Sequence, residues 1–206
     1  MTRTVRDAYG ARSAEYIELF GGIDAAAEAD RTAVLAWARG LAGPVVDVGC
    51  GPGQWTNFLS EHDLEIEGID PTPEFVGAAQ RRHPGVRFRI GQAEHLDVDD
   101  DDESLGGILA WYSLIHIDPA LINSALTEFA RGLRPGGGLA LGFFEGPELA
   151  SFDHAVTTAY YWPLELLSAR IEACGFTVTG ADRRTAPHAR THGFITAIRK
   201  PHSTNG

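Results

Sequence analysis

The stretch VVDVGCGPG, residues 45–53, decides the fold. Its first four residues are apolar except for Asp47, and β-branched valines of this kind favour a short strand buried on both faces. Glycines follow at positions 49, 51 and 53. A glycine-rich turn between a strand and the next helix is where an α/β sheet holds a nucleotide-like ligand, because glycine lets backbone N–H groups approach closely. The sequence therefore predicts a ligand cradle here.

The spacing of these glycines differs from the dinucleotide fingerprint G-x-G-x-x-G. Counting from Gly49 puts Gln54 where the third glycine belongs, and counting from Gly51 puts Thr56 there. Neither register fits, so a nicotinamide-dependent oxidoreductase is disfavoured. A turn with only a structural role remains the alternative at this point.

Strand and helix patterns alternate after the loop, which favours βαβ units and a mainly parallel sheet. A helix and then two strands without a helix between them end the chain, and such strands should pair antiparallel. We expect an α/β fold with a Rossmann-like, doubly wound, seven-stranded, mostly parallel sheet and an antiparallel C-terminal strand. The expected strands are 45–48, 64–69, 86–90, 105–111, 139–144, 176–180 and 194–199, and the expected helices are 54–61, 73 onward, 118–133 and 163–173.

The first forty residues have helical patterns in two segments. Tyr9 and Tyr16 share a broad apolar face of the first, and Asp24 is the expected cap of the second, which runs to about Leu41. We expect residues 1–42 to form a helical lid or cover, 43–200 the ligand-binding domain, and 201–206 a flexible tail.

Asp70 ends the second expected strand, at the roughly 20-residue separation typical of a carboxylate that accepts hydrogen bonds from ribose hydroxyls. Its alternative role is to cap or solvate the strand end. Thr72 is better placed to cap the next helix, with Pro73 at the first helical position. Asp70 is therefore expected to bind ligand.

Composition narrows the class of protein. A length of 206 residues fits one domain, and the formal charge of −11 weighs against a nucleic-acid partner. No apolar run is long enough to span a membrane, and the N-terminus lacks a signal-peptide pattern, so we expect a cytoplasmic protein. Cys50 and Cys174 are far apart, and no ligand grouping has zinc spacing, so no metal is expected. The acidic run at 97–103 is interpreted as a solvated loop rather than a calcium site.

Further motifs follow the glycine loop in order: GID at 68–70, GQAEHL at 91–96, LAWYSLIH at 109–116 and LRPGGG at 133–138. The ordered set spans about residues 40–145. It resembles the class I S-adenosylmethionine (SAM)-dependent methyltransferases that act on small molecules, in particular the families called methyltransferase type 11 and type 25. The resemblance implies an enzyme with SAM as cofactor and S-adenosylhomocysteine as product.

Roles for individual residues come from the resemblance. It implies that the glycines pass beneath the methionine moiety, that Asp47 supports the loop, that Asp70 holds the ribose hydroxyls and that Trp111 borders the transferred methyl. Gln92 departs from the aspartate that many relatives have. The implied cofactor-binding set is Asp47, Gly49, Cys50, Gly51, Gly53, Asp70, Pro71, Ala93, Glu94 and Trp111.

His116 is the candidate general base, because a neutral imidazole can accept a proton near pH 7. The alternative is a histidine at a helix entry that bonds to backbone. Aromatic residues before Pro163 are expected at a pocket rim in a loop. The expected substrate-side set is Tyr9, Tyr16, Tyr112, His116, Tyr160 and Trp162.

The expected activity is methyl transfer to O, N or C of a small-molecule acceptor by direct in-line displacement. Two alternatives stay open: a relative that keeps the fold but performs another transfer, and a non-catalytic SAM-binding or partner-binding protein of the same fold. A closed pocket lined by Trp111, His116 and Tyr160 would favour an enzyme. No nucleic-acid or membrane partner is expected, and the chain is expected to be a monomer or a homodimer.

Overall fold

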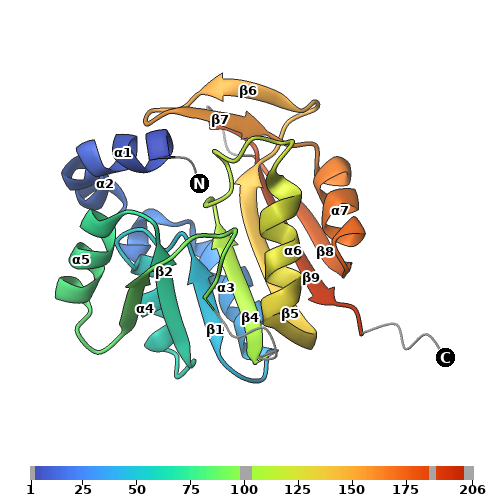
Figure 1. Ribbon diagram of the computed structural model, residues 1–206, viewed down its shortest axis with the longest axis horizontal. Helices are drawn as coiled ribbons and strands as arrows, with labels where there is room; N and C mark the ends of the chain where they lie inside the picture. Colours follow the sequence, from blue (N-terminus) through green and yellow to red (C-terminus); the bar gives the residue numbers. More distant parts are fainter. Residues whose placement is uncertain (1–2, 98–103, 186–188, 202–206) are drawn as a thin grey trace.

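A seven-stranded sheet forms the centre of the computed structural model, which describes residues 3–97, 104–185 and 189–201 (Figure 1). The strand order is β3-β2-β1-β4-β5-β9-β8. The first five strands are parallel, while β9 runs antiparallel to both β5 and β8. The strands are β1 Val45–Val48, β2 Ile66–Asp70, β3 Arg87–Ile90, β4 Leu105–Trp111, β5 Leu133–Phe144, β8 Phe176–Arg184 and β9 His192–Arg199. The expected fold class is confirmed.

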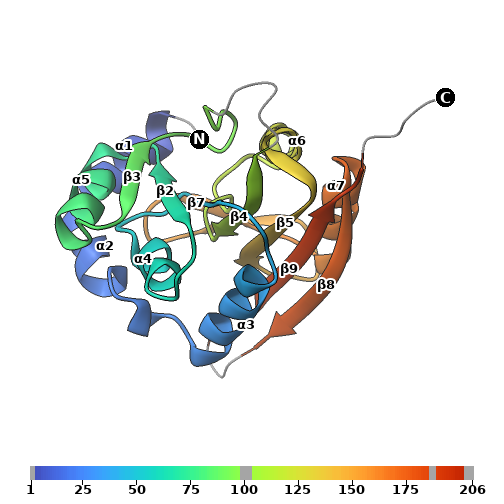
Figure 2. The same cartoon turned by 90° about the horizontal axis from the view of Figure 1, so that it is seen from below.

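Helices cover both faces of this sheet, as the view from below shows (Figure 2). Successive strand residues point to opposite faces, so Val46 and Val48 pack with α6 and α7, whereas Val45 packs with α3 and α4. The strands at the centre are buried on both sides, as their continuous apolar runs require. The helices are α1 Arg3–Ala11, α2 Ser13–Phe20, the short 3-10 helix η1 Ile23–Ala25, α3 Glu28–Arg39, α4 Gln54–Ser60, α5 Pro73–Arg82, α6 Ile122–Gly132 and α7 Leu164–Ala173.

Two helix starts differ from the prediction. Asp24 lies in η1 and pairs with Arg31 at 3.2 Å instead of capping, and α3 begins after Ala27. Asp118 accepts a hydrogen bond from the Ala120 N–H at 2.9 Å, which makes a turn before α6 rather than its first residue. In both cases the carboxylate bonds to another nearby group and does not cap the helix.

Three strands are longer than predicted. β5 begins at Leu133, which was expected to end the preceding helix, because Leu133 pairs with Leu105 before the register shifts. β8 continues to Arg184 and β9 begins at His192, since the two strands pair along that whole length. The extension carries Arg184 and His192 to the end of the sheet where β1 and β4 also finish.

A two-stranded antiparallel ribbon, β6 Ala150–Asp153 and β7 Thr158–Tyr161, lies across the same end of the sheet, opposite the α1–α2 pair (Figure 1). The sequence was expected to form a loop here. Stacking of Phe152 on Tyr161, with ring centroids 4.2 Å apart, stabilises the ribbon across its strands. The predicted tail at 201–206 lies outside the described residues except for Pro201. Most of the acidic run, 98–103, lies outside them as well.

Candidate functional site

The glycine loop joins β1 to α4, and its glycines serve different purposes. At Gly51, where φ is +54°, a Cβ would meet only the Tyr16 ring, 3.9 Å away. At Gly53, where φ is +86°, a Cβ would lie 2.7 Å from the Phe88 ring and 3.0 Å from Ala79. A Cβ at Gly51 would therefore be in ordinary contact with the Tyr16 ring alone, while Gly53 allows the loop to pack against α5 and β3.

Asp70 ties the end of β2 to this loop. One carboxylate oxygen accepts the Gly51 N–H at 3.0 Å and the other accepts the Thr72 N–H at 2.8 Å. Burial raises the pKa of Asp70 to about 6, although both N–H donors lower it. Thr72 holds the cap position of α5 without a side-chain cap bond, so the Asp70 carboxylate bonds to the Thr72 backbone instead.

Asp47 and Cys50 are buried beside the loop. Asp47 accepts a hydrogen bond from the Thr56 hydroxyl at 2.7 Å, which joins β1 to α4. Burial raises the pKa of Asp47 to about 7, and it raises that of the Cys50 thiol as well. Cys50 packs with Val76 and Phe88, a position that suits an inert apolar thiol.

The N-terminal helices lie over the loop. Tyr16 packs on Phe75 of α5 with ring centroids 5.2 Å apart, and on Phe20 at 5.0 Å. Tyr9 contacts the edge of Tyr16 at 5.6 Å. Burial and the charge of Asp70 raise the pKa of Tyr16 to about 12, so the phenol stays protonated beside that carboxylate. These rings close the site above Gly51.

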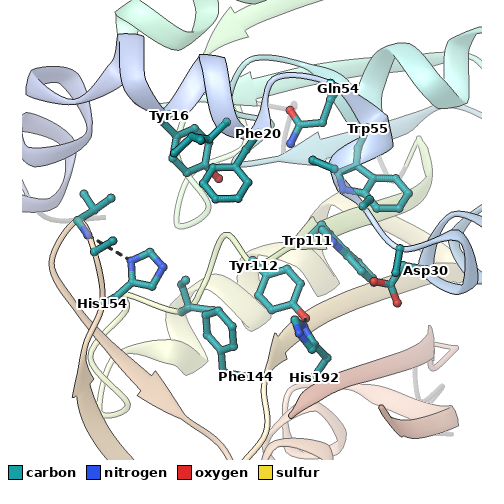
Figure 3. Close-up of a pocket in the computed structure, with 18 of the residues that line it drawn as sticks. Tyr16, Phe20, Asp30, Gln54, Trp55, Trp111, Tyr112, Phe144, His154 and His192 are labelled. Carbon is teal, nitrogen blue, oxygen red and sulfur yellow. Dashed lines mark hydrogen bonds between the residues drawn. The ribbon is translucent and has the colours of Figure 1, made fainter. Parts of the chain in front are cut away.

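A cavity of about 480 Å³ adjoins the loop, between the N-terminal helices and the ends of β4, β5 and β9. Its volume falls in the roughly 300–1,000 Å³ range of small-molecule sites. Figure 3 shows rings from separate elements pointing into it. The labelled lining residues are Tyr16, Phe20, Asp30, Gln54, Trp55, Trp111, Tyr112, Phe144, His154 and His192.

Three of the predicted substrate-side residues, Tyr9, Tyr16 and Tyr112, line this cavity, and so does the predicted cofactor residue Trp111. Trp111 packs on Trp55 with ring centroids 5.0 Å apart. Ala93 is buried in the main core instead of at the cavity. The other predicted cofactor residues are likewise absent from the lining residues: Asp47, Gly49, Cys50, Gly51, Gly53, Asp70, Pro71 and Glu94.

Tyr160 and Trp162 are placed differently from the prediction. Trp162 was expected at a pocket rim, but it is 1% exposed and belongs to the main core. Its backbone N–H donates to Phe144 O at 2.9 Å, so the end of β7 turns inward beside β5. Tyr160 packs on the same core, and its N–H donates to Ile115 O at 2.9 Å.

His116 lies behind Tyr9 and outside the cavity lining. Its Nδ1 donates to Thr158 O at 2.7 Å, which leaves Nε2 as the acceptor for the Tyr9 hydroxyl at 2.8 Å. Burial lowers the pKa of His116, which favours this neutral form. With both ring nitrogens bonded, His116 connects α1 to the β6–β7 ribbon, a role closer to the backbone-bonded alternative than to a general base.

Sequence reasoning did not select two histidines that line the cavity. No spacing pattern in the sequence links His154 or His192 to β4 or β5. His192 is paired in space with Tyr112, 80 positions away.

Removing the Tyr9 hydroxyl should loosen the N-terminal helices. Tyr9→Phe keeps the ring contacts but leaves His116 Nε2 without its donor, a loss of about 1 kcal/mol for one hydrogen bond. We expect trypsin to cleave the N-terminal helices about fivefold faster in the variant, as followed by mass spectrometry. Tyr161→Phe, which removes a phenol bonded to Arg190 elsewhere, is the matched control. Equal cleavage rates in wild type and Tyr9→Phe would contradict the role of this bond.

The central segment of the chain is similar to known methyltransferases. Residues 45–137 match the methyltransferase domain family. An uncharacterised methyltransferase of Mycobacterium bovis is 36% identical over 97 residues, which are 47% of this chain and 38% of that protein. Trans-aconitate 2-methyltransferase of Methylobacterium nodulans is 37% identical over 107 residues, 49% of this chain and 39% of that protein. The matched region thus spans about two fifths of these relatives' length.

Solved structures share the fold over most of the chain. The 1,6-didemethyltoxoflavin-N1-methyltransferase of Burkholderia thailandensis, solved with its substrate and S-adenosylhomocysteine, has a TM-score of 0.78 at 23% identity, covering 96% of this chain and 88% of that one. The cyclase SpnF has a TM-score of 0.69 at 21% identity, covering 84% and 81%. Within the described residues no helix has the length and apolar character to cross a membrane.

Proposed function

We propose that the whole chain transfers a methyl group from SAM to an oxygen, nitrogen or carbon of a small-molecule acceptor, on the premise that residues 45–137 match the methyltransferase domain family. The match agrees with the resemblance to class I SAM-dependent methyltransferases and with the seven-stranded fold. The observation that carries the proposal is a ligand-sized cavity that begins at Gln54, directly after the glycine loop.

The residues present fit this cofactor. At Gly51 a Cβ would meet no atom closer than the Tyr16 ring at 3.9 Å, so this glycine is covered only by the N-terminal helices. Each oxygen of Asp70 accepts one backbone N–H, and a carboxylate oxygen has capacity for a second donor such as a ribose hydroxyl. The Oε1 atom of Gln54 is buried without a hydrogen-bond partner among the described residues, at the boundary between loop and cavity. It is an acceptor suited to an ammonium group.

The cofactor supplies an electrophilic methyl group on a sulfonium. The chain's own residues position and enclose the reactants. The aromatic rings around the cavity hold the acceptor in one orientation and exclude water, and Tyr9 and Tyr16 close the site from the N-terminal side. Positioning of this kind accounts for about 7–11 kcal/mol of barrier lowering. No nucleophilic side chain is needed, which agrees with the buried, inert position of Cys50.

Two alternatives to methyl transfer are a non-catalytic SAM-binding protein and a relative that performs another reaction. A non-catalytic SAM-binding protein would hold the cofactor beside a filled site, whereas here a cavity lies next to the loop. A relative with another reaction is the stronger competitor, because the cyclase SpnF has the same fold. The cavity supports a small-molecule acceptor for either reaction.

Calorimetric titration with S-adenosylhomocysteine tests the cofactor half of the proposal. We expect one binding site per chain at pH 7.5, and well-folded protein that shows no heat of binding would refute the proposal. The second half is tested by incubating the protein with methyl-labelled SAM and candidate acceptors. Transfer of the label supports methyl transfer, while binding without transfer to any acceptor favours the non-catalytic alternative.

Cofactor affinity should rise with pH through about 6, the value to which burial raises the pKa of Asp70. A raised carboxyl pKa means that the folded protein without ligand holds a proton below pH 6. Ribose hydroxyls donate to the ionised carboxylate, so binding below pH 6 must first remove that proton, at about 1.4 kcal/mol per pH unit. We expect S-adenosylhomocysteine to bind about tenfold more weakly at pH 5 than at pH 7.5.

Circular dichroism at both pH values checks that the protein stays folded during this measurement. The same raised pKa means that Asp70 contributes stability below about pH 4 that is lost as the pH rises through about 6. A lower affinity at pH 5 therefore cannot come from this carboxyl destabilising the fold. Equal affinities at the two pH values would show that the ionisation of Asp70 is not coupled to binding.

A further inference from the structure

Four aromatic rings line the cavity beside the ends of β4 and β5. Trp55 and Trp111 lie with ring centroids 5.0 Å apart, and Tyr112 and Phe144 are also 5.0 Å apart. All four line the cavity (Figure 3). Rings attract other rings by offset or edge-to-face contact, worth about 0.5–1.5 kcal/mol per pair beyond burial. The walls therefore favour a flat, aromatic ligand over a saturated one of the same size.

Charges around the cavity are already neutralised. Four charged side chains line it in the described part of the chain, and they form two pairs: Arg12 with Glu15 at 2.9 Å, and Arg184 with Asp30 at 2.5 Å. Burial lowers the pKa of His154 to about 4, so it is neutral near pH 7. A charged ligand would lose its hydration in this cavity without gaining an unpaired partner, which favours an uncharged ligand.

Tyr112 is held in an unusual backbone conformation at the end of β4, with φ at +56°. A non-glycine residue in this region carries strain, and such residues concentrate at functional sites. The conformation is held by the Tyr112 N–H, which donates to Gly142 O at 2.9 Å, and by a side-chain hydrogen bond between the Tyr112 hydroxyl and His192 Nδ1. The chain thus directs this phenol into the cavity.

The Tyr112–His192 pair is the main polar feature of the aromatic wall. Burial lowers the pKa of His192, as does Arg184, while Asp30 acts in the opposite direction. Neutral His192 with its proton on Nε2 accepts a hydrogen bond from the Tyr112 hydroxyl at Nδ1. Burial raises the pKa of Tyr112, so the phenol stays protonated. Its oxygen then keeps a lone pair that can accept one further hydrogen bond from the cavity side.

We propose that the methyl acceptor is an uncharged, flat aromatic molecule whose O–H or N–H group donates a hydrogen bond to Tyr112, which His192 holds in place. This proposal rests on the methyl-transfer function proposed above and specifies the acceptor for that same site. It requires three properties of the ligand together: an aromatic ring for the walls, no net charge, and one donor for the Tyr112 oxygen.

Equilibrium dialysis with simple probes tests these properties, using the 206-residue chain saturated with S-adenosylhomocysteine at pH 7.5. 2-Naphthol has all three properties. Decahydro-2-naphthol lacks the aromatic ring, 2-naphthoate is charged and also has no O–H donor, and 2-methoxynaphthalene has lost only the O–H donor. We expect 2-naphthol to bind about tenfold more tightly than the saturated or the charged probe. It should bind about fivefold more tightly than the methyl ether, the difference of one hydrogen bond.

Two variants test whether the Tyr112–His192 pair causes the fivefold preference for 2-naphthol over its methyl ether. In Tyr112→Phe the advantage of 2-naphthol over its methyl ether should fall to less than about twofold, while the ether itself binds as in wild type. His192→Leu should have the same effect, because the Tyr112 hydroxyl is then no longer oriented, and it replaces the first variant if that one does not fold. Tyr161→Phe is the control, and it should keep the full fivefold difference.

The outcomes separate the two proposals. If S-adenosylhomocysteine does not bind, the methyl-transfer proposal is refuted and the acceptor proposal falls with it. If S-adenosylhomocysteine binds but decahydro-2-naphthol or 2-naphthoate binds as tightly as 2-naphthol, the acceptor class is wrong while methyl transfer stands. An advantage of 2-naphthol that persists in both Tyr112→Phe and His192→Leu refutes the role of the pair.

Discussion

Asp70→Asn should weaken the binding of S-adenosylhomocysteine by about 100-fold to 1,000-fold. The loss has two sources. Hydrogen bonds to a charged acceptor contribute about 1.5–3 kcal/mol each, and an amide oxygen replaces them only in part. In addition, the asparagine NH₂ must face either the Gly51 N–H or the Thr72 N–H, since those donors occupy both carboxylate oxygens now. A donor then opposes a donor beneath the cofactor, so the loop loses its support as well.

Calorimetry at pH 7.5 measures this loss, and Asp63→Asn is the matched control. Asp63 is an exposed carboxylate outside the site, with a positive φ of 63° that asparagine tolerates well. The control should bind S-adenosylhomocysteine as wild type does. Because the substitution is nearly isosteric, thermal unfolding separates a lost ligand contact from a lost fold. A dissociation constant for Asp70→Asn within threefold of wild type would contradict the assignment of Asp70.

The sheet and the loop could be predicted from the sequence because their signals are local. The run of residues 45–53 contains a strand and its turn within one segment, and Asp70 follows from the end of the next strand. Trp111 and Tyr112 were placed by the same rule, that parallel strands end at a common edge of the sheet. Each of these inferences needs only one strand and its neighbour.

The far wall of the cavity could not be predicted, because it is assembled from distant segments. Arg184 pairs with Asp30 across 154 positions, and His192 reaches Tyr112 across 80. Both depend on β8 and β9 extending beyond their apolar cores into polar residues. Trp162 shows the opposite error: a proline after it indicated a loop, yet backbone bonds to the end of β5 bury the ring. Backbone pairing of this kind has no signal in the residue types themselves.

Gly53→Ala and Gly51→Ala should separate the two purposes of the glycine loop. Gly53→Ala should lower the free energy of unfolding by about 2–5 kcal/mol. A left-handed conformation costs a non-glycine residue about 1–2 kcal/mol, and a methyl placed 2.7 Å from the Phe88 ring adds about 1–3 kcal/mol of overpacking. Urea denaturation followed by tryptophan fluorescence measures this change.

Gly51→Ala has the same backbone cost but almost no clash, since only the Tyr16 ring lies within 4 Å, at 3.9 Å. Its unfolding free energy should fall by only about 1–2 kcal/mol. Its added methyl enters the space proposed for the cofactor, so its affinity for S-adenosylhomocysteine should fall about tenfold or more. Gly53→Ala protein that is still folded should lose less affinity, because its methyl points at α5 and β3. The two variants should thus rank in opposite order for stability and for binding. The same order in both measurements would mean that Gly51 shapes the loop without forming the cradle.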